Sequence, residues 1–143
     1  MVDSIYLAYS ATSAYFDFGY FRFMTTIRRI FFDKLTVGAR IGILEHELRA
    51  TQPIYIDAEF DTVVDQPSDD NQIDTVLDYR QLRQTILDCC LAQHVNLLET
   101  LIERTAHTLL EQFPSVIRVR LRISKPEAFA DCDAVGIEFE LHR

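Results

Sequence analysis

The sequence predicts an α+β domain in which an antiparallel four-stranded sheet carries two helices on one face, in the order ββααββ. Two observations predict this class. Apolar and polar residues alternate in the first and last parts of the domain, as in strands with one buried face. Between them, two stretches repeat apolar residues at helical spacing. Antiparallel hairpins leave one sheet face for both helices to cover. At 143 residues, the chain is long enough for one domain with its own core.

The two predicted N-terminal strands differ in how cleanly they alternate. Residues 27–39 alternate loosely and are rich in Ile, Phe and Val, which favours a strand. Residues 54–64 alternate cleanly, with a mainly apolar face of Ile54, Ile56, Ala58, Phe60, Thr62 and Val64. The opposite face of this strand carries Asp57, Glu59 and Asp61. A polar loop over residues 66–71 ends the pattern.

Two helices are predicted between the strand pairs. Asp78 is suited to cap a helix that runs to about Ala92. Asn96 is suited to cap the second helix, with Glu99 three residues later as in a capping box, and Phe113 before a proline ends it. The residues expected to face inward are Leu82, Ile86 and either Cys89 or Cys90 in the first helix, and Leu98, Leu101, Ile102, Thr105, Leu109 and Leu110 in the second.

Two strands of opposite charge close the chain. The first is expected to turn Ile117, Val119, Leu121 and Ile123 to the core and Arg118, Arg120 and Arg122 away from it. The second is expected to turn Val135, Ile137, Phe139 and Leu141 inward, and Glu138 and Glu140 outward. A row of arginines would suit phosphate, but acids on a neighbouring strand account for it more simply.

Composition excludes several classes of partner and cofactor. A net charge of −8 argues against nucleic acid or an anionic membrane as a partner, and no apolar run reaches the roughly 18 residues of a membrane span. The three cysteines are an odd number and two are adjacent, which predicts reduced thiols in the cytoplasm. The four histidines are scattered without a His-x-His pair, so neither a metal nor another cofactor is expected.

The first 23 residues hold half of the chain's 6 Tyr and 10 Phe. Asp3 and Asp17 do not fit a secretory signal, which needs a basic start and an uninterrupted apolar core. We expect residues 1–23 to be an extension to a domain at 24–143. The extension is interpreted either as dispensable, with Met24 as the true initiator, or as an aromatic arm that packs on a neighbouring subunit.

Four motifs in register resemble the dihydroneopterin aldolase family, over a range from about Ile27 to the C-terminus. They are Gly42-x-x-x-x-Glu47-x-x-x-x-Gln52, Asp74-Thr-Val-Leu-Asp-Tyr79, Asn96-Leu-Leu-Glu99, and Ile123-Ser124-Lys125-Pro126 followed by Asp131-Cys-Asp-Ala-Val-Gly-Ile137. The resemblance implies the tunnelling fold, in which the sheets of several subunits close edge to edge into a barrel. We therefore expect a homo-tetramer or homo-octamer, in which the acidic strand of one subunit meets the arginine strand of the next.

The resemblance also implies the reaction and its residues. The reaction is cofactor-free cleavage of 7,8-dihydroneopterin, a small-molecule pterin, to 6-hydroxymethyl-7,8-dihydropterin and glycolaldehyde, in which the N5=C6 imine of the ring takes up electrons. Lys125 is the expected catalyst that relays protons, and Tyr79 of an adjacent subunit stacks on the ring and assists. Glu99 accepts hydrogen bonds from the 2-amino and N3–H edge, and Glu47 contacts the hydroxyls of the side chain. The remaining substrate-binding candidates are Leu77, Leu98 and Thr100.

Two alternatives stay open at this point. A related epimerase acts on dihydroneopterin triphosphate and needs cations near the substrate tail, which Arg40 or Arg49 could supply. A non-catalytic pterin-binding oligomer would keep Glu99 and Tyr79 as ligands but lose proton transfer, and the presence of Lys125 and Glu47 argues against it. Glu45 has the wrong offset from Gly42 for the role of Glu47. The segment between the first two strands is expected to be a loop, and Gln52 is expected to serve its architecture.

Overall fold

The structure is a computed structural model that describes residues 25–143. Its strands are β1 (Ile27–Ala39), β2 (Gln52–Val63), β3 (Val116–Lys125) and β4 (Val135–His142). Its helices are α2 (Glu45–Arg49), α3 (Tyr79–Leu91) and α4 (Leu98–Gln112), with a 3-10 turn η1 (Ile73–Thr75) before α3. The sequence expectations for residues 1–23 and Met24 concern residues outside the described range.

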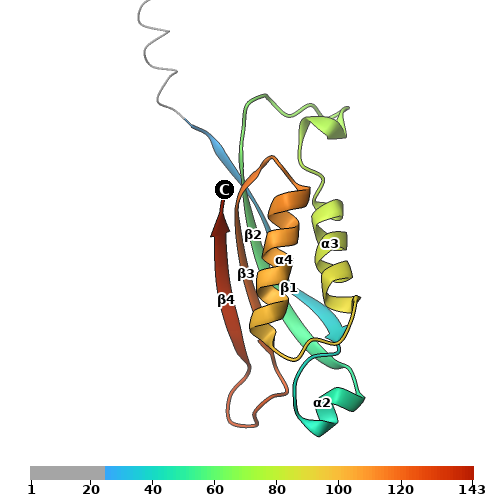
Figure 1. The fold of residues 1–143 in the computed structure, drawn as a ribbon. Helices are drawn as coiled ribbons and strands as arrows, with labels where there is room; N and C mark the ends of the chain where they lie inside the picture. The colour runs from blue at the N-terminus through green and yellow to red at the C-terminus, as the bar shows by residue number, and fades with distance from the viewer. Residues whose placement is uncertain (1–24) are drawn as a thin grey trace, which may run out of the picture.

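The four strands form one antiparallel sheet in the order β1-β2-β3-β4, so β1 and β4 are its edges. Helices α3 and α4 lie side by side against one face of the sheet (Figure 1). The predicted α+β class and the order ββααββ are thereby confirmed. The one further helix, α2, occupies the segment between β1 and β2 that was expected to be a loop. No helix within residues 25–143 is long and apolar enough to cross a membrane.

The core lies between this face of the sheet and the two helices. The apolar face read from residues 54–64 is buried as predicted, and Ile54, Ile56, Ala58 and Phe60 are at most 1% exposed. Strand β3 adds Val119, Leu121 and Ile123. Strand β4 covers the edge of the core with half-buried residues, namely Ile137, Phe139 and Leu141, while Val135 is 42% exposed.

A β-bulge at the start of β3 overturns one detail of the predicted alternation. Asp61 of β2 stands opposite Arg118, but the next residue, Thr62, stands opposite Val116. Ile117 is thus the extra residue of the bulge, and Val116 is the fully buried residue in its place. The prediction that Ile117 faces the core is wrong, because a strict period of two cannot anticipate an inserted residue.

The start of α3 matches the sequence prediction. The Asp78 side chain accepts a hydrogen bond from the Arg80 backbone N–H at 2.9 Å, which is the capping contact expected of it. The helix ends at Leu91, within one residue of the predicted end. Of the two adjacent cysteines, Cys90 is the one that points to the core, together with Leu82 and Ile86.

The start of α4 does not match the prediction. The helix begins at Leu98, its N-cap is Leu97, and the N-cap makes no side-chain capping bond. Asn96 is therefore not the cap, and Glu99 is not part of a capping box. The reason lies in the preceding segment, because Val95 exchanges backbone hydrogen bonds of 3.0 Å with Arg40 and Gly42 and stays extended. The predicted apolar stripe is buried at Leu101, Ile102, Thr105 and Leu109, while Leu98 and Leu110 are half-buried.

The exposed face of the sheet holds a network of opposite charges within one chain. The acids of β2 pair in register with the arginines of β3, as Asp57–Arg122, Glu59–Arg120 and Asp61–Arg118. Arg118 also lies 2.9 Å from Glu140 of β4, and Arg120 lies 2.8 Å from Glu138. The balance of arginines by neighbouring acids is confirmed. The expectation that the acidic strand meets the arginine strand of another subunit is wrong, because the two strands are neighbours in the same sheet.

Candidate active site

A pocket of about 230 Å³ is lined by residues of α2 and the turn before it, of the start of α4, and of the end of β3 and the start of β4. Figure 1 shows that these segments lie at the same end of the sheet. One wall comes from the turn after β1 and from α2, a second from the start of α4, and the third from the end of β3 and the start of β4. Its lining residues are Gly42, Ile43, Glu47, Asn96, Leu97, Leu98, Glu99, Lys125, Val135, Gly136 and Ile137. Four residues predicted from the sequence, namely Glu47, Leu98, Glu99 and Lys125, therefore share one cavity.

Glu47 and Lys125 form an ion pair at the base of this pocket, although 78 residues separate them in the chain. Their side chains are 8% and 16% exposed, so the contact is largely shielded from solvent. The Glu47 carboxylate also accepts hydrogen bonds from the Leu44 backbone N–H at 3.0 Å and from the Gln52 side-chain amide at 3.1 Å. Because a carboxylate offers about four acceptor positions, these three donors leave one for a ligand.

These contacts keep Glu47 ionised. Burial is the largest influence and opposes ionisation, but hydrogen bonds from Lys125, Leu44 and Gln52 outweigh it and lower the pKa of Glu47 from 4.5 to about 2. At neutral pH, Glu47 is therefore a carboxylate that can only accept hydrogen bonds. Gln52 also donates to the Ile41 carbonyl at 2.7 Å, so the role in loop architecture expected for it extends to holding Glu47.

Gly42 is the residue that allows Glu47 to reach this position. Its φ of +124° is a conformation that side chains of L-residues rarely adopt. A Cβ atom on Gly42 would lie 1.9 Å from Oε2 of Glu47, which is far inside van der Waals contact. The spacing Gly42-x-x-x-x-Glu47 therefore has a steric cause, because the carboxylate occupies the space that a side chain at residue 42 would fill.

The start of α4 supplies a second carboxylate of different character. Glu99 lies in the first turn of α4, where the helix dipole favours a negative charge. Its side chain is exposed, and within residues 25–143 it makes no ion pair or hydrogen bond. Whereas Glu47 is almost saturated by protein donors, Glu99 keeps its acceptors available for a ligand that enters the pocket.

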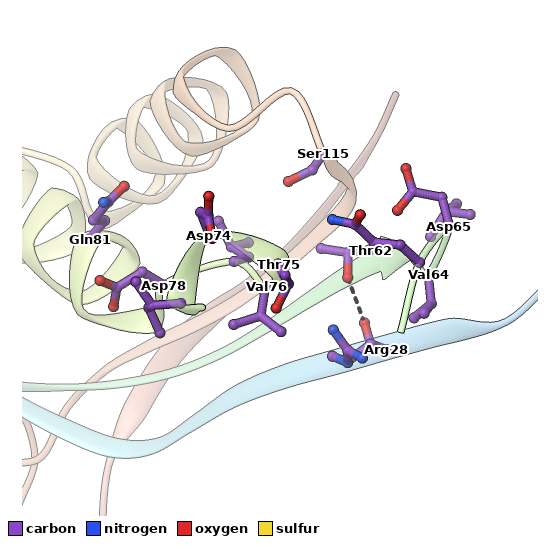
Figure 2. A pocket seen from close by; sticks show the side chains of 14 residues that line it. Arg28, Thr62, Val64, Asp65, Asp74, Thr75, Val76, Asp78, Gln81 and Ser115 are labelled. Atoms are coloured by element: carbon purple, nitrogen blue, oxygen red, sulfur yellow. Dashed lines mark hydrogen bonds between the residues drawn. The ribbon is translucent and has the colours of Figure 1, made fainter. Parts of the chain in front are cut away.

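Three further site residues from the sequence prediction do not line this pocket. Thr100 is exposed on α4. Tyr79 is 62% exposed at the start of α3, and Leu77 lines a separate cavity of about 440 Å³ beside η1. Figure 2 shows side chains around that second cavity, which also includes Ser115. Because Ser115 and Lys125 stand at opposite ends of β3, the two cavities are roughly 30 Å apart along the strand.

Sequence reasoning missed Gly136 as a determinant of the third wall. It pairs with Ser124 across β3 and β4, and a Cβ atom on it would lie 2.2 Å from the Ile123 carbonyl oxygen. A side chain there would push β4 away from the end of β3 next to Lys125. The signal was present as a glycine inside an otherwise apolar strand, which often marks a close approach of two backbones.

Metal-ligating residues do not gather in the part of the chain that is described. No group of three or more His, Cys, Asp or Glu side chains within residues 25–143 is placed to hold a metal ion. His46, His94, His107 and His142 come from different elements, as the sequence suggested. The ionisable side chains that line the pocket are the carboxylates of Glu47 and Glu99 and the amine of Lys125.

Comparison with known proteins agrees with this arrangement. The family model described as FolB, dihydroneopterin aldolase, matches residues 30–140. A dihydroneopterin aldolase from Methylorubrum extorquens is 32% identical over 100 residues, which is 70% of this chain and 77% of the relative.

Two solved structures extend the likeness to the fold. Dihydroneopterin aldolase from Burkholderia thailendensis, bound to guanine, has a TM-score of 0.71 and 29% identity, over 82% of this chain and 92% of that one. The Escherichia coli enzyme in complex with neopterin has a TM-score of 0.69 and 25% identity, over 80% of this chain and 98% of that one. With the match covering most of the described domain, this chain belongs to the dihydroneopterin aldolase family and is a lyase of that class.

Proposed function

We propose that the pocket between α2, α4 and the β3–β4 turn is the site at which this aldolase cleaves 7,8-dihydroneopterin, with Glu99 for recognition and the Glu47–Lys125 pair for chemistry. The observation that carries the assignment is the contrast between two carboxylates in one cavity. Glu47 is buried against an amine, and Glu99 is exposed with free acceptors. A reaction that must both hold a flat heterocycle and move protons needs one group of each kind.

Recognition of the ring falls to Glu99 and the start of α4. A pterin presents its 2-amino group and its N3–H side by side, and one carboxylate can accept both hydrogen bonds. Guanine and neopterin, which are bound in two of the similar structures, share this edge. The backbone at Leu98, beside Glu99, completes the ring-binding wall, and the half-buried Leu98 side chain offers an apolar surface to the ring.

Chemistry falls to the pair at the base of the pocket. The ammonium of Lys125 first releases a proton to solvent, and the neutral amine then takes the proton of the 2′-hydroxyl, directly or through a water, while Glu47 orients the side-chain hydroxyls. The C1′–C2′ bond then breaks, glycolaldehyde leaves, and the bonding electrons move through C6 to N5 to give an enamine. Return of a proton to C1′ forms the hydroxymethyl product. The balance needs no external oxidant or reductant, because the ring imine accepts the electrons.

The substrate is unphosphorylated in this proposal. The triphosphate alternative requires cations near the tail, and Lys125, which is held by Glu47, is the one cation among the residues that line the pocket. Arg49 pairs with Glu45 on α2, and Arg40 lines a different cavity near the end of α3. The relatives reported above are aldolases, which supports the same choice.

A neighbouring subunit completes the site in this proposal. The pocket of about 230 Å³ is smaller than the roughly 300–1,000 Å³ of typical ligand sites. Its lining includes Ile43, Leu97 and Val135, which are 42–63% exposed, and within residues 25–143 the outer edges of β1 and β4 are unpaired. Joining edge β1 of one copy to β4 of the next gives a ring-closing barrel of four or eight subunits, which would bring Tyr79 and Leu77 to the pocket of the neighbour.

Subunit mixing tests the shared site. Tyr79→Ala and Lys125→Ala homo-oligomers are each expected to be inactive. After subunit exchange, a mixed interface has one wall from each variant, so part of the activity should return. Exchange is followed independently with labelled subunits, and absence of recovery after confirmed exchange contradicts a site built by two chains.

We also place the enzyme in the cytoplasm, on the basis of its thiols. Within the described residues, Cys89, Cys90 and Cys132 are all free, and burial raises the pKa of the Cys90 thiol to about 12. Fractionation of cells that produce the chain, with the aldolase activity as marker, tests this assignment. Activity in the membrane or secreted fraction would contradict it.

The function itself is tested by separating binding from turnover. Purified protein is incubated with 7,8-dihydroneopterin, and the two products are identified. Glu99→Ala should weaken pterin binding severely, by about 1–3 kcal/mol or more, because the buried donors of the ring lose their acceptor. Lys125→Ala should still bind pterin but turn over roughly 10²–10⁴-fold more slowly. Arg122→Ala, on the same strand but outside the pocket, is the matched control.

A further inference from the structure

His94 lies behind the pocket and not among the residues that line it. It stands between α3 and α4, and its Nε2 atom lies 2.9 Å from the carbonyl oxygen of Gly42. Because a carbonyl oxygen only accepts, Nε2 carries the proton and donates it. The other ring nitrogen, Nδ1, is buried and has no partner among the described residues. Within that range, the hydrogen bonding of this imidazole is therefore directed to Gly42.

The bond from His94 is the third of three that join the two walls of the pocket. The Val95 N–H donates to the Arg40 carbonyl, and the Gly42 N–H donates to the Val95 carbonyl, both at 3.0 Å. These two bonds involve the backbone and form with any non-proline residue at position 94. The third alone depends on a side chain. It fixes the orientation of the Gly42 carbonyl at the point where the chain leaves the bridge between Ile41 and Val95.

The orientation of that carbonyl matters because Gly42 touches the acid of the catalytic pair. The Glu47 carboxylate fills the space beside the Cα atom of Gly42, and its Oε2 accepts from the Leu44 N–H two residues later. A rotation of the peptide that follows Gly42 would therefore move the groups that hold Glu47 against Lys125. On the other side, two residues after His94, Asn96 begins the segment that carries Glu99.

We propose that His94 is a positioning residue of the aldolase reaction, which holds the Gly42 turn so that the Glu47–Lys125 pair stands at a fixed place relative to the ring-binding wall at Glu99. This inference rests on the proposed function of those three residues. His94 does not contact the substrate in this arrangement. It acts on the reaction through Gly42 and Glu47.

Three substitutions separate the hydrogen bond from the volume of the ring. His94→Leu removes the donor and keeps an apolar side chain. His94→Gln keeps a donor, because the glutamine amide nitrogen reaches the position of Nε2. His94→Asn is the matched control for polarity, because its shorter amide reaches only the position of Nδ1. The substrate is 7,8-dihydroneopterin, and unsubstituted pterin, which lacks the side chain, probes the ring-binding wall alone.

The expected result is a split between turnover and ring binding. His94→Leu and His94→Asn should lower kcat roughly 10- to 100-fold, the range for a displacement of about 1 Å in a catalytic group. Pterin should bind them within about twofold of wild type, because Glu99 is carried by α4. His94→Gln should recover most of kcat. If His94 merely stabilised the fold, its substitution would lower the thermal unfolding temperature without separating kcat from pterin binding.

Two results overturn the proposal. One is wild-type kcat in a folded His94→Leu protein that has lost the donor. The other is equal kcat in His94→Gln and His94→Asn. If the variants do not fold, nitrogen NMR of wild-type His94 decides, since an Nδ1-protonated tautomer contradicts the geometry. If wild-type protein does not cleave dihydroneopterin, the proposed function is wrong. If wild-type protein is fully active and the His94 variants keep its kcat, only the inference about His94 is wrong.

Discussion

Two groups of charged residues in this chain, the pocket pair and the charge network on the exposed sheet face, are held in opposite ways. Within residues 25–143, Glu47 and Lys125 form an ion pair only with each other, and the backbone at Gly42 lies against the Glu47 carboxylate. The sheet face instead shares its charges among several partners, with Arg118 in contact with Glu59, Asp61 and Glu140. In the network, each arginine lies near acids of the neighbouring strands, and none of these arginines lines the pocket. In the pocket, by contrast, Glu47 keeps one hydrogen-bond acceptor position free for a ligand.

The comparison teaches that charge density does not identify the site. Along the sequence, the arginines of β3 and the acids of β2 are the most conspicuous charges, and they neutralise one another across the sheet. The pair proposed to carry the chemistry has one carboxylate and one amine. It stands out only when burial and steric enclosure are known. Four experiments sharpen or break this contrast, from the largest expected effect to the smallest.

Gly42→Ala should have the largest effect, because it attacks the enclosure of Glu47. Alanine is strained at a φ of +124°, and its Cβ atom would collide with the Glu47 carboxylate. We expect turnover to fall roughly 10²-fold and the free energy of unfolding to fall by about 1–3 kcal/mol. Steady-state kinetics and urea denaturation measure the two effects.

Gly38→Ala is the matched control for Gly42→Ala. Gly38 lies near the end of β1, four residues before Gly42, but a Cβ atom on Gly38 would meet nothing within 4 Å. This variant should keep wild-type turnover and stability. Equal losses in the two glycine variants would contradict a specific role for Gly42, and unchanged activity in Gly42→Ala would show that Glu47 needs no such enclosure.

Much of the fold was predictable because apolar and polar residues alternate along most of the strands and apolar residues recur at helical spacing between them. Residues 27–39 form β1 with the predicted bounds, and Asp78 caps α3 as predicted. The failures have local causes. Ile117 is displaced by a bulge, and Asn96 does not cap α4, because backbone bonds to Arg40 and Gly42 keep the preceding segment extended. Neither a bulge nor a long-range backbone bridge leaves a periodic signal.

The sequence named residues that the structure brings to one pocket, but it did not reveal their arrangement. Glu47, Glu99 and Lys125 were found through their motifs, yet the contact between Glu47 and Lys125 joins positions 78 residues apart. Such a pair is set by strand order and by the turn at Gly42, which spacing alone does not reveal. The motif also predicted Tyr79, which lies at the start of α3, at the far end of β3 from Lys125, so its proposed role depends on a second chain.

Arg118→Met tests the charge network and should have the next largest effect. The Arg118 side chain is 14% exposed and lies between Glu59, Asp61 and Glu140. Its loss leaves these acids facing one another, so we expect the free energy of unfolding to fall by about 1–3 kcal/mol. Arg120→Met, with a 38% exposed side chain, should cost about 1 kcal/mol or less. Neither variant should change kcat, and a tenfold loss in either one would join the network to the site.

Acid titration distinguishes Glu47 by the pH range in which its contribution to the free energy of unfolding is lost. The pKa of Glu47 is lowered from 4.5 to about 2 in the folded chain, so its stabilising effect is complete above pH 4.5 and disappears as the pH falls toward 2. The pKa of Asp61 is also lowered, chiefly by its hydrogen bond from Arg29, so wild-type acid sensitivity has several sources. Comparison with Glu47→Gln isolates one of them. The stability difference between the two proteins should shrink between pH 4.5 and 2, and a constant difference would refute the lowered pKa.

Glu45→Gln should have the smallest effect, and it is the sharpest control because Glu45 lies two residues from Glu47 in the same short helix. Its side chain is 77% exposed and pairs with Arg49 one turn later, which is also exposed. An exposed pair at this spacing contributes about 0.3–0.5 kcal/mol, because both charges remain solvated and two flexible side chains must be ordered. Unfolding free energy should therefore change by no more than about 0.5 kcal/mol, and kcat and KM should stay at wild-type values. Glu47→Gln, measured beside it, should lose turnover, since the amide offers Lys125 a neutral partner in place of a carboxylate. If Glu45→Gln proves as damaging as Glu47→Gln, the helix as a whole matters more than the buried carboxylate, and the contrast between the pocket pair and the exposed charges breaks down.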